Sequence, residues 1–308
     1  MGGAKITRKT LRLPSPVDGL SLAVEKMEPA GGIRGIVQIS HGMAEHKERY
    51  EDFMTFLAEN GYLCVIHDHR GHGGSVRRPE DLGYFYTEDP AALAEDLYAV
   101  TAMIRAEHPQ VPLYLFSHSM GTLVARSYLK RHDRALSGLV LCGPPTRNPL
   151  VGLALALAGL TRGKALAARR GRLLNRLTFG GAYRRFGREN QWLSSDPEQV
   201  ARYQRDPLCG FIFTNNGMLN LYRLQQAAFD PADWQVANPE LPVLLMAGSD
   251  DPVIGSETRF FELRDFLNRL GYRQVDTKLY PGLRHELLNE LNRDEVMRDV
   301  LSWFACRI

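Results

Sequence analysis

The residue type best placed for covalent chemistry is Ser119, at the centre of the sequence SHSMG (residues 117–121). This sequence follows the apolar run 112–117 and opens a helical pattern. A serine on so sharp a strand-to-helix turn, with small residues two positions away on each side, is typical of a nucleophile elbow. Ser119 also lies where a helix N-cap belongs, and this motif alone does not separate the two interpretations.

Two loops further along the chain hold an acid and a histidine. Asp251 follows the apolar run 242–247, and His285 follows a Pro-Gly turn before the last helical segment. We assign His285 as the general base that takes the proton of Ser119, and Asp251 as the acid that orients the imidazole. The neighbouring Asp250 is interpreted as a solvated loop acid or a helix cap.

Attack by a serine on a carbonyl creates an oxyanion, which needs two fixed hydrogen-bond donors. One predicted donor is the backbone N–H of Met120, directly after Ser119. The other is the backbone N–H of Met43, in the loop that follows the apolar run 33–40. Both donors are main-chain groups, so their side chains do not affect this assignment.

These groups must be positioned by the strands and helices that the hydrophobic pattern predicts. Strand-type runs cover residues 10–13, 20–28, 33–40, 62–67, 112–117, 137–142, 242–247 and 276–280, and helical patterns cover 50–60, 90–108, 120–131, 257–270 and 294–304. The first two runs flank an Asp18-Gly19 turn and predict an antiparallel hairpin. The later alternation predicts an α/β fold with a mostly parallel sheet, flanked by helices, and catalytic groups at the carboxyl ends of its strands.

The alternation stops between residues 146 and 236, where no convincing strand pattern appears. We interpret this stretch as a helical cap inserted into a core formed by residues 1–145 and 237–308. The length of 308 residues and the 44% hydrophobic content suit one enzyme-sized domain with such an insertion.

Charge and cysteine content narrow the function classes. A net charge of +3 does not require a nucleic-acid partner, and no recognition motif for nucleic acid is present. The four cysteines form no CxxC pair, which favours a reducing compartment. No signal peptide is evident, and the longest apolar run, 150–160, is about half of the ~20 residues that a spanning helix needs. We expect a cytoplasmic protein, or one that lies against a membrane without crossing it.

Several motifs resemble, in order, those of monoacylglycerol lipases and bacterial lysophospholipases of the α/β-hydrolase superfamily. They are HGMAEH (41–46) with RY (49–50), HDHRGHGGS (67–75), SHSMG (117–121), GSDDPV (248–253) and YPGLRHE (280–286). The resemblance implies an α/β-hydrolase fold and hydrolysis of a single-chain acyl ester without a cofactor or metal. It also implies the triad Ser119, Asp251 and His285 with the oxyanion donors Met43 and Met120. The departures are Ser117 in place of glycine and the bulky Met43.

Several histidines allow another interpretation. The spacing of His67, His69 and His72 could serve a metal-dependent hydrolase, but Gly71 stands where such sites need an aspartate. We interpret this segment as a structural turn beneath the oxyanion loop. Four residues nearer the predicted site are expected to form hydrogen bonds around it rather than to react: His41, Glu45, His46 and His118.

The predicted cap carries an apolar stretch, 149–160, beside a basic one. The basic residues are Arg162, Lys164, Arg169, Arg170, Arg172, Arg176, Arg184, Arg185 and Arg188. Such a pair suits peripheral membrane contact through residues 150–188, and equally a cap helix with a solvated basic face. The predicted substrate is a small amphiphilic lipid. An aminopeptidase or amidase on the same fold, and a catalytically silent binding module, stay as alternatives; the oligomeric state is left open.

Overall fold

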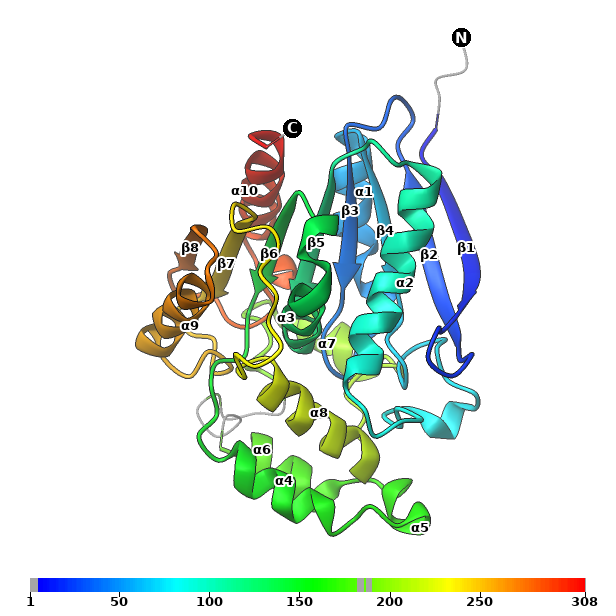
Figure 1. Cartoon of the computed structure of the whole chain (residues 1–308), viewed down its shortest axis with the longest axis vertical. Coiled ribbons are helices and arrows are strands. Elements are labelled where there is room, and N and C mark those ends of the chain that lie inside the picture. Colours follow the sequence, from blue (N-terminus) through cyan, green and yellow to red (C-terminus); the bar gives the residue numbers. More distant parts are fainter. Residues whose placement is uncertain (1–4, 182–185, 187–189, 308) are drawn as a thin grey trace.

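The computed structural model describes residues 5–181, 186 and 190–307, and its core is a sheet of eight strands (Figure 1). The order across the sheet is β1-β2-β4-β3-β5-β6-β7-β8. The strands are β1 (Thr7–Pro14), β2 (Ser21–Glu28), β3 (Gly35–Ser40), β4 (Tyr62–His67), β5 (Leu113–His118), β6 (Gly138–Cys142), β7 (Pro242–Gly248) and β8 (Gln274–Tyr280).

The predicted hairpin and parallel sheet are both confirmed. β1 pairs antiparallel with β2 and β2 with β4, whereas every pair from β4 to β8 is parallel. Strands β3 to β6 are buried along their whole length, as expected of apolar runs covered on both faces. β1 begins at Thr7, earlier than the predicted residue 10, because its polar first residues pair with the end of β2 rather than with an apolar core.

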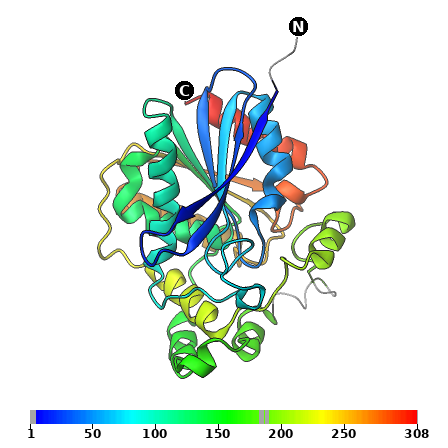
Figure 2. The same cartoon turned by 90° about the vertical axis from the view of Figure 1, so that its right-hand side faces the viewer.

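Helices cover both faces of the sheet (Figure 2). One face carries α2 (Ala91–Glu107), α3 (Met120–His132) and α9 (Glu257–Leu270), and the other carries α1 (Glu51–Glu59) and α10 (Arg293–Ala305). Their apolar sides pack on opposite faces of the sheet and form two separate hydrophobic cores. The layered architecture is therefore the predicted one.

The segment between β6 and β7, residues 143–241, is called the insertion below. It contains α4 (Val151–Gly159), α5 (Lys164–Ala167), α6 (Arg172–Phe179), α7 (Pro197–Arg205) and α8 (Asn215–Ala227). Its described residues form no strand, only an isolated bridge between Arg170 and Thr214. The helices α4, α5, α6 and α8 lie together beyond the carboxyl ends of the sheet strands (Figure 1). The cap boundaries 146 and 236 stay a prediction.

The order of the strands decides where loops can meet. β3 lies between β4 and β5, so the chain winds outward in one direction after β3 and in the other direction from β5 onward. At such a switch point the loops that leave two neighbouring parallel strands diverge and open a crevice at their carboxyl ends. The loops after β3 and β5 are the two that were predicted to supply the oxyanion donors.

Candidate active site

Ser119 lies at the carboxyl end of β5 in a strained turn. Its φ of 51° and ψ of −121° are far from helical values, and its side chain makes no capping hydrogen bond to α3. Instead its Oγ lies 2.8 Å from Nε2 of His285. The N-cap interpretation of its side chain is therefore wrong, and the geometry is that of a nucleophile elbow.

The turn needs its small neighbours for different reasons. A Cβ at Gly121 would lie 2.2 Å from the carbonyl oxygen of Ser40, because α3 starts directly against the end of β3. Ser117 is fully buried, and its hydroxyl donates to the carbonyl of Val140 on the adjacent strand β6 at 2.8 Å. The serine that replaces the usual glycine thus has a hydrogen-bond partner and leaves the turn intact.

His285 joins the serine to an acid. Its Nδ1–H donates to Oδ2 of Asp251 at 2.9 Å, and this bond leaves Nε2 as the acceptor that faces Ser119. Both His285 and Asp251 are almost fully buried. The other carboxylate oxygen of Asp251 accepts from the N–H of Val253, which fixes the orientation of the carboxylate. Asp251 and not Asp250 meets the histidine.

The surroundings of His285 favour its protonated form. Burial by itself lowers the pKa of the imidazole, but the charge and hydrogen bond of Asp251 outweigh burial, and Glu286 and Glu45 add to their effect. The net result is a His285 pKa above its ordinary value. A base with this property accepts the serine proton more readily than a free imidazole does.

The loop after β3 (residues 41–46, the β3 loop) lies against Ser119. A Cβ at Gly42 would lie 3.1 Å from the Cβ of Ser119. The N–H groups of Gly42 and Ala44 have acceptors in the side chains of Glu45 and His72. The N–H of Met43, between them, has no protein acceptor in the described part of the chain, and neither has that of Met120. Both residues line the cavity at Ser119, as a pair of oxyanion donors would.

The buried histidines near this loop are structural hydrogen-bonding groups. His41 accepts from the N–H of His69 and donates to the carbonyl of Gly42, at 2.9 and 2.8 Å. His72 accepts from Ala44 and donates to the carbonyl of Arg70, at 3.2 and 3.1 Å. Burial is the main cause that lowers the pKa of His41 to about 4 and of His72 to about 3, so both rings are neutral at pH 7.

The three-histidine metal interpretation has no geometric support. Both ring nitrogens of His72 are occupied by backbone partners, and Nε2 of His69 bonds the hydroxyl of Ser40. The two ring nitrogens of His67 have no hydrogen-bond partner among the described residues, and its ring contacts that of His69 edge-on. The segment packs beneath the β3 loop, as a structural turn would.

A buried ionic network lies beside the triad. The guanidinium of Arg49 donates to Glu45 and to both carboxylate oxygens of Glu286. Glu45 also accepts from Tyr50 and from the N–H of Gly42. The sequence pattern singled out Glu45, but it indicated no role for Arg49 or Glu286. The two residues lie far apart in the chain, and the sequence signal that could have found them is their position in two of the motifs.

His118 precedes the nucleophile and faces the base. Its ring centroid lies 4.7 Å from that of His285. Burial and the neighbouring His285 lower the pKa of His118 to about 4, so one of the two adjacent rings stays neutral. Trp192 of the insertion covers His285 from another side, with ring centroids 5.1 Å apart. No local sequence pattern marks Trp192, so its place beside His285 was not predicted.

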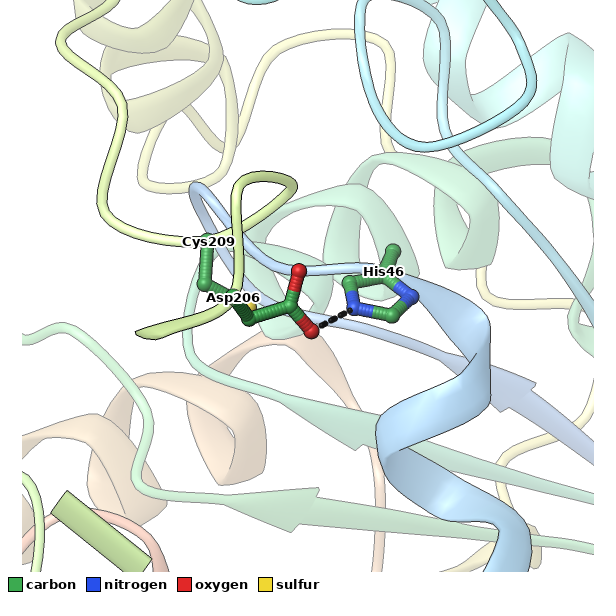
Figure 3. Close-up of side chains that lie close together, drawn as sticks. All are labelled: His46, Asp206 and Cys209. Atoms are coloured by element: carbon green, nitrogen blue, oxygen red, sulfur yellow. Dashed lines mark hydrogen bonds and ion pairs between the residues drawn. The ribbon is translucent and has the colours of Figure 1, made fainter. Parts of the chain in front are cut away.

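His46, Asp206 and Cys209 form the one group of metal-ligand type whose ligand atoms all lie within 4.8 Å of one another among the described residues (Figure 3). The imidazole of His46 is already hydrogen-bonded to Glu48 at 2.5 Å and to Asp206 at 2.8 Å. Burial lowers the pKa of His46, but these two carboxylates raise it above its ordinary value. Both ring nitrogens of His46 are therefore engaged by carboxylates, and the contact with Asp206 connects the β3 loop to the insertion.

A cavity of about 1120 Å³ opens over Ser119 and His285. Its walls come from the β3 loop and largely from the insertion, whose apolar lining includes Leu150, Leu153, Ala154, Leu157, Leu174 and Leu221. The arrangement combines an activated hydroxyl, two free N–H groups and an apolar channel. Such a site can transfer an acyl group to serine and then to water.

The fold and the site define an α/β-hydrolase. The structure superposes on a thermostable carboxyl esterase from Bacillus coagulans in complex with glycerol with a TM-score of 0.90 at 26% identity, covering 98% of this chain and 99% of that one. The model of the family described as serine aminopeptidase, S33, matches residues 31–292, and the chain belongs to this family.

Relatives with curated names span nearly the whole chain. A monoacylglycerol lipase of Mycolicibacterium smegmatis is 28% identical over 297 residues, which cover 95% of each chain. A monoglyceride lipase of Mus musculus is 26% identical and covers 94% of this chain and 89% of its own. A soluble variant of the monoglyceride lipase from Saccharomyces cerevisiae, solved with a substrate analog, shares the fold with a TM-score of 0.72 at 19% identity, covering 100% of this chain and 99% of that one.

Across the described residues, no helix combines the length and apolar content required to traverse a bilayer.

Proposed function

We propose that the protein hydrolyses the acyl ester of single-chain lipids, such as monoacylglycerols or lysophospholipids, with Ser119 as nucleophile. The observation that carries this proposal is the chain of hydrogen bonds from Ser119 through His285 to Asp251, at 2.8 and 2.9 Å, at the floor of an apolar cavity. The names of the curated relatives support the same substrate class.

The proposed reaction has two halves. The Oγ of Ser119 attacks the acyl carbonyl while its proton passes to Nε2 of His285, and the N–H groups of Met43 and Met120 stabilise the oxyanion. The C–O bond to the alcohol then breaks as His285 returns the proton to the leaving oxygen. Water repeats the sequence on the acyl-enzyme: it loses a proton to His285, attacks the carbonyl, and the fatty acid leaves as Ser119 regains its proton.

The lining of the cavity favours an ester over an aminoacyl substrate. An aminopeptidase needs an acceptor for the cationic amine of its substrate. The acids among the described lining residues are Glu45 and Glu286, and Arg49 bonds both. The exposed lining residues Arg147 and Arg259 are cations instead. A free amine would meet positive charge and already paired carboxylates.

Exposed leucines of the insertion suit contact with a lipid surface. Leu150, Leu153, Leu157, Leu160, Leu166, Leu173 and Leu177 are 40–78% exposed, and all lie on or beside α4, α5 and α6. Leu150, Leu153, Leu157 and Leu177 also line the cavity, so its mouth and the apolar surface coincide. Lipids could then enter directly from a membrane or micelle.

The basic residues of the insertion do not form one free face. Arg162 pairs with Glu88, and Arg170 donates to backbone carbonyls of Glu80, Leu82 and Ile212, so both have structural partners. Arg169, Arg172 and Arg176 are exposed and have no ion pair with any described residue. Arg184, Arg185, Arg188 and the side chain of Lys164 lie outside the described residues. We propose that Arg169, Arg172 and Arg176 are the ones that face anionic headgroups.

A substrate panel tests the activity. Wild type should cleave monooleoylglycerol and lysophosphatidylcholine faster than aminoacyl p-nitroanilides, and a fluorophosphonate probe should label it. Ser119→Ala should lose labelling and activity, on the order of 10⁶-fold in kcat, with unchanged thermal unfolding. Preferred cleavage of the arylamide, or loss of activity with chelator but not with fluorophosphonate, would contradict the proposal.

Vesicle co-sedimentation tests the membrane surface. Leu160 and Leu173 are 78% and 70% exposed and lie outside the cavity lining, so the double change Leu160→Asp with Leu173→Asp should weaken binding to anionic vesicles about tenfold. Leu291 is also 70% exposed but lies outside the insertion, so it supplies the control Leu291→Asp. If the double variant and wild type bound vesicles equally, the proposed lipid contact of these leucines would be wrong.

A further inference from the structure

Ala44 in the β3 loop has a backbone conformation that alanine does not favour. Its φ is +53°, in the left-handed region, where a Cβ crowds the following carbonyl. Ala44 follows Met43, whose N–H is one of the two proposed oxyanion donors. The position of that donor therefore depends on whatever holds Ala44 in this conformation.

Hydrogen bonds from the insertion hold Ala44 in this left-handed conformation. The carbonyl oxygen of Ala44 accepts from the hydroxyl of Tyr203 at 3.1 Å and from the N–H of Gly210 at 2.9 Å. These donors use both lone pairs of the carbonyl oxygen, so its direction is fixed from two sides. On the other side of the residue, the N–H of Ala44 donates to His72 of the core.

The core holds the rest of the turn. His41 donates to the carbonyl of Gly42, which belongs to the same peptide plane as the N–H of Met43. In a trans peptide the two groups point in opposite directions, so this bond turns the Met43 N–H away from His41. The core thus holds the plane of the donor, and the insertion holds the strained residue that follows it.

Tyr203 is itself kept in place. It lies on α7 with 8% of its surface exposed, and the guanidinium of Arg49 lies over its ring, 4.9 Å from the ring centroid. The His46–Asp206 hydrogen bond joins the same two segments a few residues away (Figure 3). Three contacts therefore attach this part of the insertion to the β3 loop: those of Tyr203, Asp206 and Gly210.

We infer that Tyr203 is a positioning residue for the oxyanion site: its hydroxyl keeps Ala44 in the left-handed conformation and so aims the N–H of Met43 at the reacting carbonyl. The inference rests on the proposed ester hydrolysis. The insertion then has two functions: it forms the wall of the acyl channel, and one of its side chains sets the geometry of the oxyanion donor on the core.

The variant Tyr203→Phe removes the hydroxyl and keeps the ring that Arg49 covers. Because Gly210 still holds the carbonyl, kcat should fall about 10-fold, less than the 10²–10³-fold that loss of an oxyanion donor costs. KM should stay within about threefold, and the affinity for a trifluoromethyl ketone, which forms an oxyanion on Ser119, should fall in parallel with kcat. Rates are normalised to active sites titrated with fluorophosphonate, so an unfolded fraction does not count.

The matched control is Tyr272→Phe. Tyr272 is also buried, and its hydroxyl, which the variant removes, donates to Asp133 and accepts from the indole N–H of Trp234, but it does not line the cavity. Its kcat and ketone affinity should equal those of wild type. An equal loss in both variants, an unchanged kcat in Tyr203→Phe, or a rise in KM alone would overturn the inference. An inactive wild type would instead refute the proposed function.

A double variant tests the link to Ala44. Glycine adopts a positive φ without crowding, so Ala44→Gly makes the conformation less dependent on Tyr203. In that background Tyr203→Phe should cost less than about threefold in kcat. If Tyr203→Phe alone does not fold, recovery of a folded, titratable protein in the double variant supports the same link. An undiminished penalty, or no recovery of folding, overturns it.

Discussion

Both carboxylate oxygens of Glu286 accept hydrogen bonds from the guanidinium of Arg49, at 2.8 and 2.6 Å. The same guanidinium donates to Glu45 at 2.6 Å, so one cation serves two buried acids. Glu286 directly follows His285 in the chain. His285, the proposed base, consequently lies beside excess negative charge, in addition to that of Asp251.

This charge predicts the pH dependence of the reaction. The proposed reaction needs neutral His285, and its raised pKa means that the ring stays protonated to a higher pH than the ordinary 6.5. The rate constant kcat/KM should rise with pH through an inflection above that value. Glu286→Gln removes one charge that raises the pKa and should move the inflection to lower pH. The exposed Glu240 supplies the control Glu240→Gln, and a profile unaffected by Glu286→Gln would be inconsistent with this account.

The variant Ser117→Ala tests the departure from glycine at the elbow. It removes the hydrogen bond to the carbonyl of Val140 and should lower the free energy of unfolding by about 1 kcal/mol. The small side chain keeps the turn, so kcat should stay within about threefold of wild type. Urea unfolding and ester hydrolysis measure the two effects. A large loss of kcat would show that the hydroxyl of Ser117 takes part in the reaction.

Gly121 is predicted to tolerate no side chain. Its Cβ would lie 2.2 Å from the Ser40 carbonyl, and neither backbone segment can move without shifting Ser119. Gly121→Ala should therefore abolish fluorophosphonate labelling or folding. Gly152 in α4 has nothing within 4 Å of a Cβ, so Gly152→Ala should be neutral or stabilise by up to about 1 kcal/mol. Normal labelling of Gly121→Ala would contradict the packing described here.

The buried ion pair of Arg70 and Asp96 should contribute more to the free energy of unfolding than an exposed ion pair does. Arg70 is fully buried and donates to Asp96 at 2.8 and 3.1 Å. Asp96→Ala leaves this cation with the partly exposed Asp18 as its remaining acidic partner among the described residues, and should lower the free energy of unfolding by about 3 kcal/mol. Glu198→Ala breaks the exposed pair with Arg202 and should change the free energy of unfolding by less than about 0.5 kcal/mol. Urea denaturation compares the two, and equal effects would refute the prediction.

Much of this structure follows from local sequence pattern. The run 62–67 is β4 at the predicted bounds, and α3 begins at the predicted Met120. A buried parallel strand is a continuous apolar run and an amphipathic helix is periodic, so each leaves its own signal. The insertion left a weaker signal, since α5 and α6 are short and carry exposed leucines and arginines that no core pattern explains.

The order of the motifs also determined which residues meet. Ser119, Asp251 and His285 each follow a strand of one parallel sheet, and the carboxyl ends of such strands share an edge. Their convergence was therefore predictable, as was the placement of Met43 and Met120 in loops that leave the neighbouring strands β3 and β5. Their catalytic roles stay predictions for the experiments above.

Tertiary structure alone decided the supporting contacts. Arg49 meets Glu286, Trp192 covers His285, and Tyr203 reaches the carbonyl of Ala44, although long stretches of chain separate the members of each pair. Hydrogen bonds and ring contacts between distant segments leave no periodic trace in sequence, because they depend on how the loops at the edge of the sheet converge and how the insertion folds back over them. The chain order specifies the candidate reacting groups, whereas tertiary packing, including that of the insertion, decides which side chains surround and support them.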